Sequence, residues 1–157
     1  MILGIDPGLA NTGYAVINYE LRITNYELKK TGVIKVTEGD TRLLDLYNEL
    51  EKIIKKFKVT EVAFESLFFA KNAKSGMKVA EAVGVIKLVA LRCGLEVVGY
   101  TPLQVKMALT GYGRAEKEQV EEMVRATLNL EKLIEPSHAA DAVAVALTHG
   151  FTMKIET

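Results

Sequence analysis

The sequence predicts an α/β domain, a mixed five-stranded sheet flanked by helices, and two observations lead to this prediction. Extended segments with short turns between them fill the first 38 residues, which favours three antiparallel strands. From residue 40 onward, helical patterns alternate with short apolar strands and then follow one another along the chain. Strands that alternate with helices join a sheet in parallel, so the complete sheet should be mixed.

The first half of the chain supplies four of these strands. Residues 1–6 are a short apolar run that stops at the turn PGLANTG. Two further extended stretches cover residues 13–20 and 23–38. A helix is predicted over 40–57, where apolar side chains recur on one helical face. Residues 60–66 then form a compact apolar strand, which suits burial on both faces.

The second half begins with a loop and a long helix over 76–94, which is apolar around most of its circumference. A domain of 157 residues rarely encloses a helix completely, so one stripe of this helix is expected to face a partner. The fifth strand covers 95–100, and three helices are expected over 101–109, 115–130 and 136–150.

Composition bounds the class of protein. Hydrophobic residues make up 49% and charged residues 25%, as in an ordinary folded domain. We expect one domain over residues 1–157, because this length matches the commonest domain size and no linker interrupts it. Apolar runs are too short for a membrane helix, and MILGIDPG lacks the basic region of a signal peptide. With Cys93 as the single cysteine, no internal disulfide can form, and a cytoplasmic location without membrane contact is expected.

Charge is unevenly distributed in a chain whose formal net charge is zero. Residues 66–117 contain eight basic and three acidic side chains, so the remainder is acidic. Solvated faces of opposite sign would explain this pattern. A basic middle segment would equally suit a polyanion held on one surface.

Three acidic side chains stand at unusual places. Asp6 ends the first strand and Glu65 ends the fourth, so both could point into one crevice at the edge of the sheet. Asp141 lies in the first turns of the apolar last helix, with His138 three positions earlier on the same face. No neighbouring lysine or arginine is obliged to pair with these carboxylates, and a buried carboxylate requires a partner or a metal.

Each of these residues also has an ordinary explanation. Asp6 could cap the turn that follows it, and Glu65 could be a solvated strand end. Asp141 could be favoured by the helix dipole, and His138 could be a surface residue after a Ser137 cap. These explanations are independent of one another, whereas a shared metal site accounts for all of the residues at once.

The combination of carboxylate oxygens with one imidazole suits Mg²⁺ or Mn²⁺. Two such ions about 3.5–4 Å apart form the clamp used for in-line phosphodiester cleavage. One ion activates water, and the other stabilises the leaving 3′ oxygen. The sequence therefore predicts a nuclease with two Mg²⁺ ions, or Mn²⁺, in its active site.

A family resemblance rests on four collinear segments, GIDPGLANTGYAVI, FES with FFAKNAKSG, TPLQVKMALTGYGRAEKEQV and PSHAADAVAVALTH. Together they resemble the RuvC family of bacterial Holliday-junction resolvases, over residues 2–149. The resemblance implies a ribonuclease-H-like fold, a homodimer built around the helix at 77–93, and Mg²⁺-dependent paired symmetric nicks across a four-way DNA junction. It also implies a role in recombination and repair, and cooperation with a branch-migration motor.

By the same resemblance, the family's catalytic ligands fall on particular residues of this chain. Its first aspartate falls on Asp6, its glutamate on Glu65 and its final aspartate on Asp141. The remaining acidic ligand of many members falls on His138, which departs from their pattern, although some members carry histidine there.

Contacts to DNA are expected from an aromatic ring and several lysines. Phe68 follows the fourth strand, and by resemblance its ring stacks on a base at the junction centre, although adjacent phenylalanines are more often core residues. Four lysines would position phosphates without reading sequence: Lys71, Lys78, Lys106 and Lys117. Of these, Lys106 and Lys117 match family lysines near the scissile strand.

Three other functions compete with the junction endonuclease. One is a ribonuclease-H-like nuclease that cuts RNA in hybrids or branched RNA. Another is a junction-binding module without catalysis, which would gain nothing from carboxylates clustered against phosphates. The segment GIDPG also suggests an ATP-binding domain of the actin and hexokinase type. That fold needs two such domains and a second phosphate loop, for which 157 residues leave no room.

Overall fold

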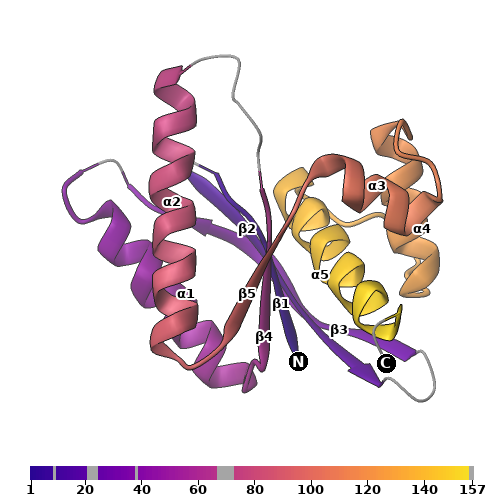
Figure 1. The fold of residues 1–157 in the computed structure, drawn as a ribbon, viewed down its shortest axis with the longest axis horizontal. Coiled ribbons are helices and arrows are strands. Elements are labelled where there is room, and N and C mark those ends of the chain that lie inside the picture. The colour runs from indigo at the N-terminus through magenta and orange to yellow at the C-terminus, as the bar shows by residue number, and fades with distance from the viewer. Residues whose placement is uncertain (9, 21–24, 38, 67–72, 156–157) are drawn as a thin grey trace.

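The structure is a computed structural model of residues 1–157, and it describes residues 1–8, 10–20, 25–37, 39–66 and 73–155. The described residues form a sheet between two helical layers (Figure 1). Helices α1 (Arg42–Phe57) and α2 (Ala73–Arg92) cover one face of the sheet. On the other face lies α5 (Ser137–Ile155), and α3 (Pro102–Thr110) and α4 (Lys117–Thr127) pack against it.

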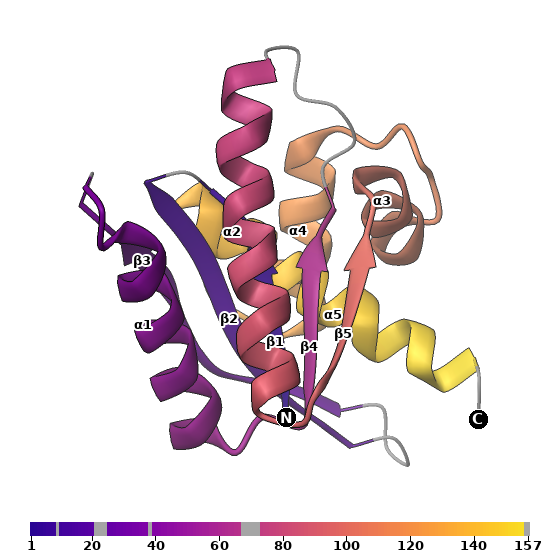
Figure 2. The ribbon, with the colours of Figure 1, turned by 60° about the vertical axis from the view of Figure 1, so that its left-hand side comes forward.

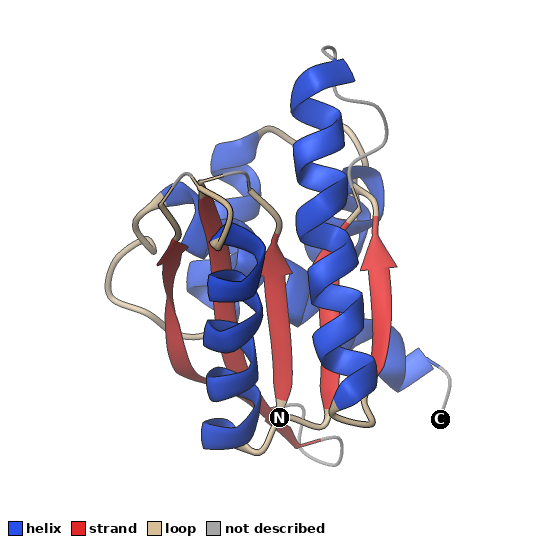
Figure 3. Cartoon of the chain, turned by 90° about the vertical axis from the view of Figure 1, so that its left-hand side faces the viewer, coloured by secondary structure: helices blue, strands red, loops and turns tan. Residues whose placement is uncertain are grey.

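The sheet is five-stranded and mixed, as predicted, with the order β3-β2-β1-β4-β5. Its central strand β1 (Ile2–Asp6) pairs antiparallel with β2 (Asn11–Glu20) and parallel with β4 (Glu61–Glu65). The antiparallel side ends with β3 (Asn25–Lys35), and the parallel side ends with β5 (Glu96–Tyr100). Because β1 and β4 run in the same direction, their C-terminal ends lie at one edge of the sheet (Figure 3).

Helices α2, α4 and α5 differ most from the predicted bounds, and α5 continues to Ile155, where residue 150 was expected. Helix α2 begins at Ala73, not at residue 76, because alanine and lysine in this stretch are good helix formers. Helix α4 ends at Thr127, where residue 130 was expected. The residue Asn129 follows with a left-handed backbone (φ 51°), which an α-helix cannot include.

Small residues let α5 approach the sheet closely. A Cβ atom on Gly4 of β1 would lie 2.3 Å from the carbonyl oxygen of Ala142 and 2.6 Å from the Cβ of Ala146. Glycine is therefore required here by the close contact between strand and helix. The result is that α5 lies across the central strands, with its first turn at the edge where β1 ends (Figure 2).

Apolar side chains form one core on each face of the sheet. Ile5, Val62 and Leu50 belong to the core beneath α1 and α2, and Val143 and Leu147 belong to the core beneath α5. Within the described ranges, no helix is both long enough and apolar enough to cross a membrane.

Candidate active site

The parallel pairing of β1 with β4 brings two predicted ligands to the same edge of the sheet. Ile5 pairs with Phe64, so the next residues along these strands are Asp6 and Glu65. Helix α5 begins at this edge, and its first two turns carry His138 and Asp141. Residues that are far apart in sequence are therefore assembled by two parallel strands and one crossing helix.

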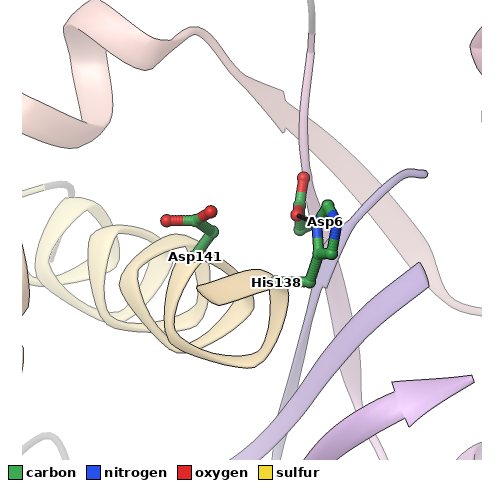
Figure 4. Close-up of side chains that lie close together, drawn as sticks. All are labelled: Asp6, His138 and Asp141. Atoms are coloured by element: carbon green, nitrogen blue, oxygen red, sulfur yellow. Dashed lines mark hydrogen bonds and ion pairs between the residues drawn. The ribbon is translucent and has the colours of Figure 1, made fainter. Parts of the chain in front are cut away.

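Asp6, His138 and Asp141 form a group whose ligand atoms all lie within 4.8 Å of one another. The Nδ1 atom of His138 lies 2.6 Å from Oδ2 of Asp6, and Asp141 projects from the next turn of α5 (Figure 4). Burial raises the pKa of Asp6, although the hydrogen bond from His138 opposes this effect. A group with two carboxylates and one imidazole fits Mg²⁺ or Mn²⁺ in its donor chemistry.

Glu65 lies near this group and lines the same cleft as Asp141. Among the described residues, the atoms close enough to share one ion belong to Asp6, His138 and Asp141, and Glu65 is not one of them. Glu65 instead lines this cleft of about 290 Å³ together with Asp141 and Lys117. Burial, and then repulsion from Asp6 and Asp141, raises the pKa of Glu65 from 4.5 to about 7. Such mutual repulsion is relieved when carboxylates share a bound cation.

Lys117 pairs with Asp141, although the sequence obliged no neighbouring lysine or arginine to pair with these carboxylates. Its Nζ atom donates to Oδ2 of Asp141 at 2.9 Å and to Oγ of Ser137 at 2.5 Å. Partial burial lowers the pKa of Lys117, but the hydrogen bond to Asp141 and the nearby carboxylates outweigh burial and raise it. The sequence could not reveal this ion pair, because Lys117 belongs to α4 and reaches Asp141 only through the packing of α4 on α5.

The other residues predicted to contact DNA differ in their position relative to this cleft. Lys106, on α3, lines the same cleft as Lys117. Lys78 lies on α2 and is not among the described residues that line this cleft. Phe68 and Lys71 lie outside the described residues.

Sequence reasoning missed two features that position the site. Gly13 of β2 packs against the backbone of His138. At the opposite end of the same elements, the buried His149 of α5 bonds to Tyr100 through Nδ1 (2.8 Å) and to Glu61 through Nε2 (3.0 Å). Glu61 begins β4, the strand that ends with Glu65, so this contact fixes α5 against β4. The alternation of strand and helix contained no signal for either contact.

Comparison with known proteins identifies the family of this fold and site. The sequence profile of crossover junction endodeoxyribonuclease RuvC matches residues 2–149. The chain belongs to the RuvC family. A crossover junction endodeoxyribonuclease RuvC from Ruminiclostridium cellulolyticum is 47% identical over 153 residues, which cover 96% of this chain and 91% of that protein.

Solved RuvC structures agree with the fold. The Thermus thermophilus RuvC structure is 36% identical, with a TM-score of 0.92, and the match covers 99% of this chain and 96% of that one. T. thermophilus RuvC in complex with a Holliday junction substrate is 35% identical, with a TM-score of 0.93 and the same coverage. The ribonuclease-H-like fold implied by the resemblance is therefore confirmed, and the chain is a nuclease of the RuvC type.

Proposed function

We propose that this protein is a structure-selective endonuclease that resolves four-way DNA junctions by paired symmetric nicks during homologous recombination and DNA repair. The observation that supports this proposal best is the group formed by Asp6, His138 and Asp141, whose ligand atoms lie within 4.8 Å of one another. This group lies at the edge of the sheet where β4 ends with Glu65. The RuvC relatives named above act on crossover junctions according to their names, and one was solved with a Holliday junction.

Divalent cations are the proposed cofactor, two Mg²⁺ ions per site or Mn²⁺ in their place. Asp6, His138 and Asp141 would hold one ion, and Glu65 would complete the ligand set for the second. When bound, such a pair activates water and stabilises the leaving 3′ oxygen. The chain itself contributes the carboxylates, of which Asp6 is buried, the imidazole that orients Asp6, and the cleft that admits the scissile strand.

Lysines are proposed to place the DNA backbone over this centre. Lys106 and Lys117 line the cleft beside Glu65 and Asp141, where their charge suits a phosphate that approaches the carboxylates. Lys71 and Lys78 are proposed to hold more distant phosphates, and Phe68 to stack on an exposed base. These assignments rest on the family resemblance and on the basic character of residues 66–117.

A homodimer is proposed as the working unit, with α2 as its interface. Three large apolar side chains of this helix are mainly exposed, namely Met77, Leu88 and Leu91. A two-fold dimer would present one active site to each of two opposed strands of a junction, which matches the two-fold symmetry of that substrate. Cooperation with a branch-migration motor and a cytoplasmic location stay predictions from the sequence.

The test compares substrates and metals directly. A labelled four-way junction, a linear duplex and an RNA–DNA hybrid are each incubated with the protein, with and without Mg²⁺, and with Asp141→Asn as the matched inactive variant. Symmetric nicks in the junction alone, dependent on metal and lost in Asp141→Asn, support the proposal. Cleavage of the hybrid favours a ribonuclease, and binding without cleavage in any divalent metal favours a junction-binding module.

A further inference from the structure

The ammonium group of Lys117 forms an ion pair with Asp141, one of the proposed metal ligands. Its ammonium contacts Oδ2 of Asp141 at 2.9 Å, and Asp141 belongs to the group that could hold a metal ion. The same carboxylate oxygen accepts a longer hydrogen bond, of 3.4 Å, from the hydroxyl of Ser137. Ser137 in turn accepts a hydrogen bond from Lys117. These three residues are therefore hydrogen-bonded to one another in a triangle, and two of them, Lys117 and Asp141, line the cleft.

We infer that Lys117 is an internal counter-cation of the metal centre: it holds Asp141 in the metal-free protein, gives up this contact when a divalent cation binds, and is then kept in the cleft by Ser137. The inference rests on the proposed function, because it assumes that Asp141 becomes a metal ligand. It assigns Ser137 the part of a positioning residue that acts through Lys117.

The positions of the two residues on their helices explain why the contact is exchangeable. Lys117 is the first residue of α4, and Ser137 is the first residue of α5. The N-terminal end of a helix carries partial positive charge, which disfavours an ammonium group. Asp141, together with the Ser137 hydroxyl, therefore holds the ammonium at this place. Once a metal takes Asp141, the ammonium keeps the Ser137 contact and is attracted to another anion. A substrate phosphate in the cleft is such an anion.

Exposure is consistent with exchange as well. The Lys117 side chain is 49% exposed and that of Asp141 is 32% exposed. An ion pair as open to solvent as this one stabilises a protein only slightly, so a divalent cation with several ligands can displace it. An ammonium and a divalent cation that both contact the carboxylate of Asp141 would also repel each other. Metal binding and the Lys117–Asp141 contact are therefore competing states of one carboxylate.

The first experiment measures metal affinity without DNA. Mn²⁺ is titrated into the full-length protein by calorimetry, for the unmodified chain, Lys117→Met and Lys106→Met. Lys106 lines the same cleft, so its variant removes the same charge while the ion pair made by Lys117 stays intact. Competition predicts that Lys117→Met binds Mn²⁺ about three- to tenfold more tightly, while Lys106→Met changes affinity less than about twofold.

The second experiment tests the position of the ammonium during the reaction. At saturating Mn²⁺ and under single-turnover conditions, Ser137→Ala should lower the rate of junction cleavage about tenfold with unchanged affinity for the junction. Ser137→Thr keeps a hydroxyl at the same place and should restore most of that rate. A purely structural role of Ser137 would instead lower the thermal stability of the alanine variant, which circular dichroism measures on the same samples.

Several results would overturn the inference. Equal Mn²⁺ affinity of Lys117→Met and the unmodified chain would do so, and so would an equal gain in Lys106→Met, since that would reflect net charge alone. Unchanged cleavage by Ser137→Ala would remove its positioning role. If the variants give these contrary results but the unmodified chain still nicks junctions with Mn²⁺, the role assigned to Lys117 fails and the proposed function stands. If it neither binds Mn²⁺ nor cuts the junction, the proposed function fails with it.

Discussion

The backbone of His138 packs against Gly13 so closely that a Cβ atom on Gly13 would lie 1.9 Å from the carbonyl oxygen of His138. Both sides of this contact are backbone, so a side chain at Gly13 can be accommodated only if α5 or β2 shifts. The first two turns of α5 carry two of the proposed ligands, His138 and Asp141. The contact therefore sets how far these ligands lie from Asp6.

Gly13→Ala should displace the first turn of α5 and weaken metal-dependent nicking. We expect a loss of about 1–3 kcal/mol in the free energy of unfolding, as for other overpacked sites, and a larger relative loss in cleavage rate. Gly32→Ala is the matched control, because its added Cβ meets only the Tyr14 side chain at 3.1 Å. Denaturant unfolding and junction cleavage measure both effects. Equal behaviour of the two variants would contradict the role of Gly13.

His138→Asp should keep metal-dependent nicking, whereas His138→Ala should lose it by about 10- to 100-fold or more. An aspartate supplies another oxygen ligand, but alanine supplies none. Without metal, the new carboxylate would face Asp6, which His138 Nδ1 now contacts at 2.6 Å, so the metal-free variant should be less stable. Mn²⁺ should therefore raise the melting temperature of His138→Asp more than that of the unmodified chain. Full activity in His138→Ala would exclude His138 from the site.

The elements of this fold could be predicted because each one is encoded locally. Alternating or continuous apolar runs gave the five strands, and the 3.6-residue period of apolar side chains gave the helices. The site residues Asp6, Glu65 and Asp141 stood out because a charged side chain at the end of an apolar segment has a high desolvation cost. The meeting of Asp6 and Glu65 at one edge followed from the parallel pairing of β1 with β4, and helix α5 adds Asp141 there.

Contacts between elements were beyond this reasoning. The Lys117–Asp141 pair depends on how α4 packs on α5, which no local pattern records. The same holds for the buried His149 of α5, whose ring nitrogens form hydrogen bonds with Tyr100 and Glu61, two residues on different strands. Such contacts are set by interhelical angles and by the depth to which small residues let α5 approach the sheet.

Leu91→Glu should separate the proposed dimer into monomers. This side chain is 66% exposed on α2, so a charge there costs little in the isolated subunit but would be desolvated in an apolar interface. Size-exclusion chromatography with light scattering should give the mass of one chain, and paired nicking of the junction should be lost. Leu133→Glu is the control, because Leu133 lies outside α2 and is 48% exposed. A monomeric unmodified protein, or a dimeric Leu91→Glu variant, would contradict the proposed interface.

The metal-free protein should lose stability as pH rises from about 4.5 to about 7, the window set by Glu65. The pKa of Glu65 is raised from 4.5 to about 7 in the folded state, so in this window the folded chain retains a proton that the unfolded chain has released. The contribution of Glu65 to the free energy of unfolding is therefore complete below pH 4.5, and it is lost as the pH rises through about 7. Since one pKa unit corresponds to about 1.4 kcal/mol, the loss due to Glu65 should not exceed about 3.5 kcal/mol.

Glu65→Gln should make this pH dependence shallower, because an amide does not titrate. Some slope should remain, since burial also raises the pKa of Asp6. Urea unfolding in chelator at several pH values measures the effect, with the exposed Glu131→Gln as the control. Saturating Mn²⁺ should reverse the trend, because cations bind the ionised carboxylates and so stabilise the folded chain more as pH rises. An unchanged slope in Glu65→Gln would mean that neither burial nor repulsion from Asp6 and Asp141 raises the pKa of Glu65.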